Sequence, residues 1–206
     1  MRKILYLLLL ILPLSLVAQS QAGDFLDKAI AKMKADAALQ MDYTYTVYDN
    51  NGKVMQADKG VMRLDGNKYS LLMNEIKVWC NGITQWSYMN GIDEIYITDA
   101  SSPEAQNLSP LYVMEMYKGG YKASLGNAGK EIGVVLEALS PDTNINKVKL
   151  CFDAADHRLK TMNIYIPGQG SVYVVLDGYT PHCKFPDNVY ECPVKEYSSA
   201  EIVDMR

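Results

Sequence analysis

The sequence predicts a mainly β protein, in which one long antiparallel sheet curls and is accompanied by two or three helices. From residue 42 onward, apolar and polar side chains alternate with a period of two, and turn signals interrupt the pattern at short, regular intervals. Only two segments after the N-terminal leader have helical spacing. A sheet of roughly ten or eleven strands must curl or split. Its concave face then needs apolar cover, and the helices are the elements available to supply it.

The chain begins with a secretory signal peptide, which we place at residues 1–22. A positively charged start precedes an apolar run over residues 4–17, and a small residue, Ala18 or Ala22, marks the cleavage site. The run is too short to span a membrane comfortably. No cysteine stands at either site to carry a lipid anchor. We therefore expect a soluble, unanchored protein in the periplasm, with residues 23–206 forming a single domain.

The composition argues against some partners and leaves others open. The net charge is −4, and it becomes more negative when the basic leader is removed, which disfavours nucleic acid and anionic membrane surfaces as partners. The chain has 11 Met and 15 Tyr against only 3 Phe. Met is flexible and is over-used at adaptable binding surfaces, although it also serves as ordinary core filler. The composition is therefore compatible with an incompletely filled apolar surface.

An amphipathic helix is expected over residues 23–39. Asp24 is placed to cap its start, and lysines and aspartates occupy the face opposite the apolar residues. The apolar positions at helical spacing are Leu26, Ala29, Ile30, Met33 and Ala37. This face is expected to pack on the sheet.

Strands and tight turns then alternate. Turns of the Asn-Gly or Asp-Gly kind punctuate the first half of the chain. The Gly-containing stretch 124–131 is also interpreted as a turn, because it lacks the spacing of a phosphate-binding loop. The expected strands cover residues 42–48, 53–64, 68–73, 76–80, 84–89, 92–98, 131–140, 146–153, 158–167 and 171–180.

A short helix with almost no polar face interrupts the strands at residues 108–120, "LSPLYVMEMYKGG". Ser109 is a cap signal and Pro110 suits the first helical position. Two glycines end the helix, and only Glu115 and Lys118 are charged. A helix on the surface of a globular protein normally shows one polar face. This one is expected to contact apolar surroundings on most sides.

The sequence offers no catalytic motif. Its two histidines belong to no motif that pairs them with a nucleophile, and neither G-x-S-x-G nor H-E-x-x-H occurs. The stretch "DNNGK" at 49–53 resembles the start of a calcium loop but lacks the required Glu. We expect no enzyme activity, no cofactor and no metal.

Four cysteines fit an oxidising compartment. Cys183 and Cys192 bracket a short segment with a turn signal, so we expect them to form a disulfide. Zinc is the alternative, with the two histidines as further ligands, but no Cys pair has zinc-finger spacing. Cys80 and Cys151 lie in apolar runs and either pair or remain buried thiols.

One hairpin carries a family resemblance. The segment 81–98, "NGITQWSYMNGIDEIYIT", resembles the D-G-x-x-x-W-x-Y hairpin of LolA, the periplasmic carrier of outer-membrane lipoproteins. Asn81 replaces the family's Asp, whereas Gly82, Trp86 and Tyr88 match.

Three further stretches resemble the same family in the same order. Residues 108–114 resemble the T-P-x-x-L start of its central helix, and residues 59–72 resemble its G-x-φ-x-K-R-P-x-x-F segment, where φ is apolar. Residues 184–193, followed by 201–206, are similar to its F-x-F-x-P-P ending. The succession spans nearly the whole mature chain.

The resemblance implies an unclosed antiparallel β half-barrel whose helices form a lid over an apolar cavity. It implies a monomeric periplasmic carrier that takes acylated lipoproteins from an inner-membrane lipoprotein-releasing transporter to an outer-membrane acceptor, whose identity the sequence does not give. The alternative is a binding module on the same fold that senses envelope lipids or proteins, and a hydrolase is a weaker third class.

The sequence departs from the family at one motif. Asp65 and Gly66 replace the family's Arg-Pro pair, and Arg63 lies too early in the strand to match its arginine. Tyr69 retains the aromatic residue that follows. What holds the lid is therefore left open.

The expected lipid-binding residues come from two sources. On the strands they are alternating positions with the longest apolar side chains, and on the short helix they are the Leu111–Met114 side and its flanks. The candidates are Tyr45, Val47, Met62, Leu64, Tyr69, Leu71, Met73, Trp86, Tyr88, Leu111, Val113, Met114 and Tyr117.

Overall fold

The structure is a computed structural model that describes residues 14–102 and 109–206. The first part of the expected leader, residues 1–13, and Leu108 lie outside the described residues. The helices are α1 (Leu14–Ala35), α3 (Pro110–Glu115) and the 3-10 turns η1 (Met116–Lys118), η2 (Asp187–Tyr190) and η3 (Val194–Tyr197). The strands are β1 (Leu39–Tyr48), β2 (Val54–Asp65), β3 (Lys68–Leu72), β4 (Ile76–Cys80), β5 (Thr84–Met89), β6 (Glu94–Asp99), β7 (Tyr121–Ala128), β8 (Glu131–Ala138), β9 (Lys147–Phe152), β10 (Leu159–Ile166), β11 (Gly170–Thr180) and β12 (Glu201–Asp204).

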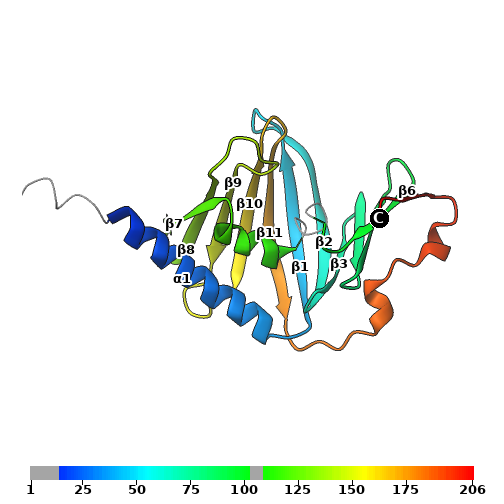
Figure 1. Ribbon diagram of the computed structural model, residues 1–206, viewed down its shortest axis with the longest axis horizontal. Coiled ribbons are helices and arrows are strands. Elements are labelled where there is room, and N and C mark those ends of the chain that lie inside the picture. The colour runs from blue at the N-terminus through cyan, green and yellow to red at the C-terminus, as the bar shows by residue number, and fades with distance from the viewer. Residues whose placement is uncertain (1–13, 103–108) are drawn as a thin grey trace, which may run out of the picture.

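The strands form one 12-stranded sheet in the order β12-β6-β5-β4-β3-β2-β1-β11-β10-β9-β8-β7. Neighbours are antiparallel except β12, which joins β6 in parallel. Within the described ranges, the end strands β12 and β7 do not pair, so the sheet stays open (Figure 1). Register shifts between Asp42 and Tyr43 and between Val47 and Tyr48 mark bulges in the central strand, which increase the local twist. The mainly β, unclosed half-barrel expected from the sequence is confirmed.

The core lies on the concave face of this sheet. In β1 every second residue from Leu39 to Tyr45 is buried, and in β9 the same alternation buries Val148, Leu150 and Phe152. Successive side chains of a strand point to opposite faces, so one alternating set per strand contributes to this core.

Helix α1 covers part of the concave face (Figure 1). Leu26, Ala29, Ile30 and Met33 are buried in the same apolar cluster as the strand residues. The helix differs from the expected one at both ends. It runs through both candidate cleavage sites, so Asp24 lies inside it rather than at its cap, and it ends at Ala35.

The chain reverses direction just after α1. Ala37 is exposed and has a φ of 54°, a left-handed conformation that ends the helix before β1 begins. Ala37 therefore does not belong to the apolar helix face, contrary to the expectation.

Two strands were not expected from the sequence. The stretch interpreted as a turn at 124–131 is mostly β7, and only the residues at Gly129 and Lys130 turn the chain. The C-terminal residues form β12 at the other edge. Both are edge strands of the sheet that the described residues form, and each pairs there with one strand only.

The segment between β11 and β12 crosses the opposite, convex face of the sheet. Arg63 and Lys68 alternate with concave residues, and their charged groups lie over the rings of Phe185 and Tyr190, at 5.9 Å in both cases. Further along, Tyr197 packs on convex residues of β4 and β5. In Figure 1 this orange-to-red segment runs along the β3–β6 end of the sheet.

No helix in the described part of the chain is long and apolar enough to cross a membrane.

Candidate functional site

The concave floor brings together most of the predicted strand residues. Tyr45, Met62, Leu64 and Tyr69 are buried in one apolar cluster. Met62 faces Leu71 across β2 and β3, and Leu64 faces Tyr69, so the register places all four on one surface. Among the half-buried side chains packed against this cluster are Val47, Leu71 and Met73.

Trp86 and Tyr88 lie on the other face of the sheet, which corrects their predicted place in the cavity. Tyr69 pairs with Cys80, and Cys80 pairs with Gln85, so Gln85 occupies the concave position of β5. Trp86 pairs with Trp79 in the second, convex cluster, which also contains Tyr88.

The physical reason for this error is the cover that the C-terminal segment supplies. Where it crosses β4 and β5, large apolar side chains are buried on the convex face of the sheet, because Cys192, Val194 and Tyr197 pack against that side. The longest apolar side chains of β5 therefore point away from the cavity. Periodicity alone gives two equivalent faces and does not distinguish them.

The short helix α3 and its continuation η1 lie over the concave floor. Val113, Met114 and Met116 are buried in the same cluster as the strand residues, and Leu111 and Tyr117 are half-buried against it. Pro110 stands at the first helical position, as expected, while the Ser109 side chain makes no capping hydrogen bond. The near absence of a polar face on this helix follows from contacts with the floor on one side and α1 on another.

Polar contacts join the outer side of this lid to α1. The Tyr117 hydroxyl donates a hydrogen bond of 2.7 Å to Asp27 Oδ1, and Lys118 Nζ lies 3.4 Å from the same atom. Lys34 Nζ donates to Glu115 Oε1 at 3.1 Å. The bond from Tyr117 is the main reason that the pKa of Asp27 is lowered. Each contact includes a largely exposed group, Asp27, Lys34 or Lys118, so each contact is weak and can be exchanged for water.

A cavity of about 320 Å³ opens between the lid and the turns that follow β2 and β4. The end of α1 and the lid contribute one wall, and the turns after β2 and β4 contribute the other. Two predicted strand residues, Leu64 and Tyr69, and one predicted lid residue, Leu111, line it. The other lining residues are Lys34, Gly66, Asn67, Cys80, Gly82, Ala100, Ser101, Ser109, Tyr112 and Glu115.

Several tyrosine hydroxyls lie on the concave floor among these apolar groups. Tyr69 donates to the Gln85 side chain, and Tyr45 accepts from Gln56 Nε2 at 2.9 Å. Tyr43, which was not among the residues predicted from the sequence, is buried with its hydroxyl unpaired among the described residues. Burial raises the pKa of Tyr43 and Tyr69, so both hydroxyls remain protonated donors at neutral pH. The alternation that placed Tyr45 on this face extends to Tyr43 and is the sequence signal that could have identified it.

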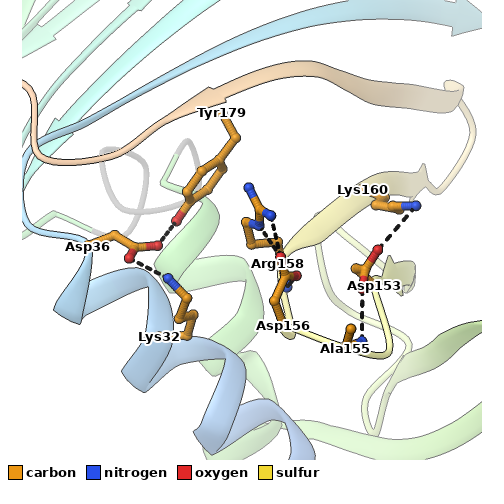
Figure 2. A network of polar contacts seen from close by, with 8 residues as sticks. All are labelled: Lys32, Asp36, Asp153, Ala155, Asp156, Arg158, Lys160 and Tyr179. Carbon is orange, nitrogen blue, oxygen red and sulfur yellow. Dashed lines mark hydrogen bonds and ion pairs between the residues drawn. The ribbon is translucent and has the colours of Figure 1, made fainter.

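A polar network anchors the C-terminal end of α1 to the sheet (Figure 2). Asp36 is ion-paired with Lys32 and accepts a hydrogen bond of 2.7 Å from the Tyr179 hydroxyl. The Arg158 guanidinium, ion-paired with Asp156, lies over the Tyr179 ring at 5.5 Å. Burial acts to raise the pKa of Asp36, but the bonds from Lys32 and Tyr179 outweigh it and the pKa is lowered. α1 is thus fixed at this end, whereas its contacts with the lid are exposed.

All four cysteines are free thiols in the structure, which contradicts the expected Cys183–Cys192 bridge. The Cys183 thiol donates to the Thr180 carbonyl at 3.2 Å, while Cys192 packs in the convex cluster. The intervening segment runs along the sheet instead of folding back on itself, so the two thiols occupy different environments. Burial raises the pKa of Cys192 to about 11, which makes it a weak nucleophile.

The chemistry of the site is that of apolar binding. The described residues contain no group of three or more His, Cys, Asp or Glu placed to hold a metal ion. Cys151 lies on the convex face and donates to Glu131 at 2.6 Å, and burial together with this bond raises its pKa to about 11. The cavity, in contrast, is lined by apolar side chains, by uncharged polar groups and by the ion-paired Lys34 and Glu115. A mainly apolar lining with a few polar groups suits a lipid chain.

A family model described as the outer membrane lipoprotein carrier protein LolA matches residues 19–168. The chain belongs to the LolA family. The match includes most of α1, the lid and the strands as far as β10, so it covers both walls of the cavity. No curated protein matches the sequence.

Solved structures that are similar to this chain have low sequence identity to it. An uncharacterized conserved protein from Thermus thermophilus is 9% identical with a TM-score of 0.50, and the match covers 89% of this chain and 99% of that chain. A LolA superfamily protein from Nitrosomonas europaea is 12% identical with a TM-score of 0.45, covering 84% and 98% of the two chains. The MucA/MucB complex from Pseudomonas aeruginosa contains a chain that is 10% identical with a TM-score of 0.44, covering 85% and 62%.

Arg63, the arginine nearest to the family's Arg-Pro position, does not take part in the lid contacts described above. Arg63 points to the convex face, where its Nε donates to Gln40 Oε1 at 3.2 Å and its guanidinium lies over Phe185. The contacts of the lid with α1 come instead from Tyr117, Lys118 and Glu115.

Proposed function

We propose that the protein is a periplasmic carrier that shields the acyl chains of lipoproteins on their way from the inner to the outer membrane. The observation that carries this proposal is the lid. The buried side chains of α3 and η1 are apolar and share one cluster with the floor, while their polar contacts with α1 are few and exposed. A cover built in this way can be exchanged for a lipid chain without exposing buried charges.

The energetics of such an exchange allow both capture and release. Burying a methylene group is worth about 0.8 kcal/mol, so a dozen sheltered carbons supply about 10 kcal/mol of gross driving force. Displacing Val113, Met114 and Met116 from the floor costs part of this gain. A closed lid therefore competes with bound lipid, which favours release at an acceptor.

The proposal names acylated lipoproteins as cargo, an inner-membrane lipoprotein-releasing transporter as donor and an outer-membrane acceptor. The family description supports a lipoprotein ligand, and the N-terminal leader supports export. The working form is the processed monomer in the periplasm.

Depletion of the protein from its own cells tests the carrier role. The expected result is that acylated lipoproteins accumulate in the inner-membrane fraction, as read by fractionation and mass spectrometry. Mass spectrometry of lipid that co-purifies with the wild-type protein identifies the bound chain. Normal lipoprotein sorting together with an altered envelope stress response would contradict the carrier role and point to a sensor.

A further inference from the structure

The hydroxyl of Tyr43 is a buried hydrogen-bond donor that lacks an acceptor. Tyr43 lies on β1 with only 7% of its surface exposed, and it belongs to the apolar cluster of the concave floor. Throughout residues 14–102 and 109–206, no hydrogen-bonding group pairs with this hydroxyl. An unpaired buried donor destabilises the unliganded protein, so its retention on this surface calls for a physical reason.

The position of the Tyr43 ring is fixed by the strand beside it. Tyr43 pairs with Gly60 of β2, and a Cβ atom built on Gly60 would lie 2.4 Å from both Cζ and the hydroxyl oxygen of Tyr43. Only glycine leaves room for the ring at this point. The ring therefore lies across β2 on the concave face, next to the Met62 position, which itself faces Leu71.

The other tyrosines of this face already have partners. Tyr45 accepts from Gln56, Tyr69 donates to Gln85, and Tyr179 donates to Asp36. Tyr43 thus differs from these three tyrosines in that its hydroxyl has no partner among the described residues, either as donor or as acceptor, on the floor that is proposed to bind lipid.

We propose that the Tyr43 hydroxyl donates a hydrogen bond to the ester carbonyl of an acyl chain bound on the concave floor, and that it makes the site selective for ester-linked over ether-linked chains. This inference rests on the proposed lipid-binding function. An acyl ester combines a long apolar chain, which suits Met62 and Leu71, with a carbonyl acceptor at one end. The acylated cysteine of a lipoprotein and a glycerophospholipid both carry this group.

The expected effect is a preference of about fivefold for an ester-linked lipid over its ether-linked analogue, equivalent to about 1 kcal/mol for one net hydrogen bond. Tyr43→Phe keeps the ring over Gly60 and removes only the donor. It should abolish the preference while retaining the affinity for the ether-linked lipid. Because it also removes an unpaired buried group, it should raise the melting temperature of the unliganded protein by about 2–4 °C.

Tyr190→Phe is the matched control. Tyr190 is also buried, at 1% exposure, and its hydroxyl is also unpaired within the described residues, but it lies over Lys68 on the convex face. This variant should raise the melting temperature in the same way and leave the ester preference unchanged. The pair of variants separates an effect on stability from an effect on the ligand.

The experiment measures dissociation constants of the mature protein for two pairs of probes. One pair is a synthetic diacylated glyceryl-cysteine peptide and its dialkyl ether analogue, and the other is a diacyl phosphatidylethanolamine and its dialkyl ether analogue. A preference for the ester in either pair that disappears in Tyr43→Phe supports the inference, and the pair that shows it identifies the source of the chain.

Four outcomes overturn the inference. Equal binding of ester and ether by the wild type removes the selectivity but leaves lipid binding intact. Retention of the preference in Tyr43→Phe, or its equal loss in Tyr190→Phe, shows that Tyr43 is not the donor. Failure of all four probes to bind refutes the proposed lipid-binding function together with this inference.

Discussion

Replacement of Met114 by glutamate distinguishes a lid from an ordinary core helix. Met114 is 1% exposed and packs between the concave floor and the rest of the covering layer. A carboxylate in this place loses the burial of the methionine, worth about 1.5–3 kcal/mol, and adds the cost of an unpaired buried charge, several kcal/mol more. The helix escapes this cost only by moving off the floor.

The two interpretations of α3 differ in how the protein melts. If α3 is integral core, a penalty of about 4 kcal/mol or more lowers the melting temperature by about 8–16 °C for a chain of this length. If α3 is a lid, it lifts away and the strands keep their own buried residues, such as Leu150 and Phe152. The melting temperature then changes little, and lipid capture is lost because the cover no longer closes.

Circular dichroism melting beside a lipoprotein-release assay on membrane vesicles makes the comparison. Met114→Leu, which nearly conserves the volume, should keep both stability and capture. Met55→Glu places the same charge on a residue that is 63% exposed, and it should behave like the wild type. A Met114→Glu protein that melts normally and still captures lipoprotein would refute the lid, and so would one whose whole sheet unfolds.

Three further perturbations test particular contacts. Gly60→Ala should displace the Tyr43 ring and lower the free energy of unfolding by about 1–3 kcal/mol, as measured by urea denaturation. Asp36→Asn should lower stability by about 1–3 kcal/mol at pH 7. Because the pKa of Asp36 is lowered from 3.8 in the folded state, its contribution is present above that value and is lost as the pH falls through the folded pKa, so variant and wild type should converge in acid denaturation. A photo-crosslinking residue at Gln85 should capture bound lipid, whereas one at Trp86 should not, and the reverse pattern would contradict the assigned faces.

The predicted fold depends on local patterns that can be recognised directly in the sequence. Alternation of apolar residues in the strands follows from the period of the β-backbone, and the missing polar face of residues 108–120 follows from burial on several sides. Both are short-range properties of the chain. They were sufficient to predict a long, curled sheet covered by apolar helices, whereas the open half-barrel was implied by the family resemblance. The structure confirms the open sheet and its apolar cover.

Which residues meet across strands could be identified only from the tertiary structure. Periodicity gives each strand two faces without saying which is concave, and the C-terminal segment inverted the expectation at Trp86 and Tyr88 by burying the convex side. The path of that segment also separates Cys183 from Cys192, although they are close in sequence.

The position of the Tyr43 side chain also could not be predicted from the sequence. Its neighbours along the chain give no reason to single it out among the tyrosines of β1. Its role depends on Gly60, which lies on another strand and is brought opposite by the register of the hairpin. The sequence by itself determined the layers of this protein, because burial is periodic along the chain. The tertiary structure decided which polar and apolar side chains share the concave face, because strand register and the path of a covering segment are set by contacts between residues far apart in sequence.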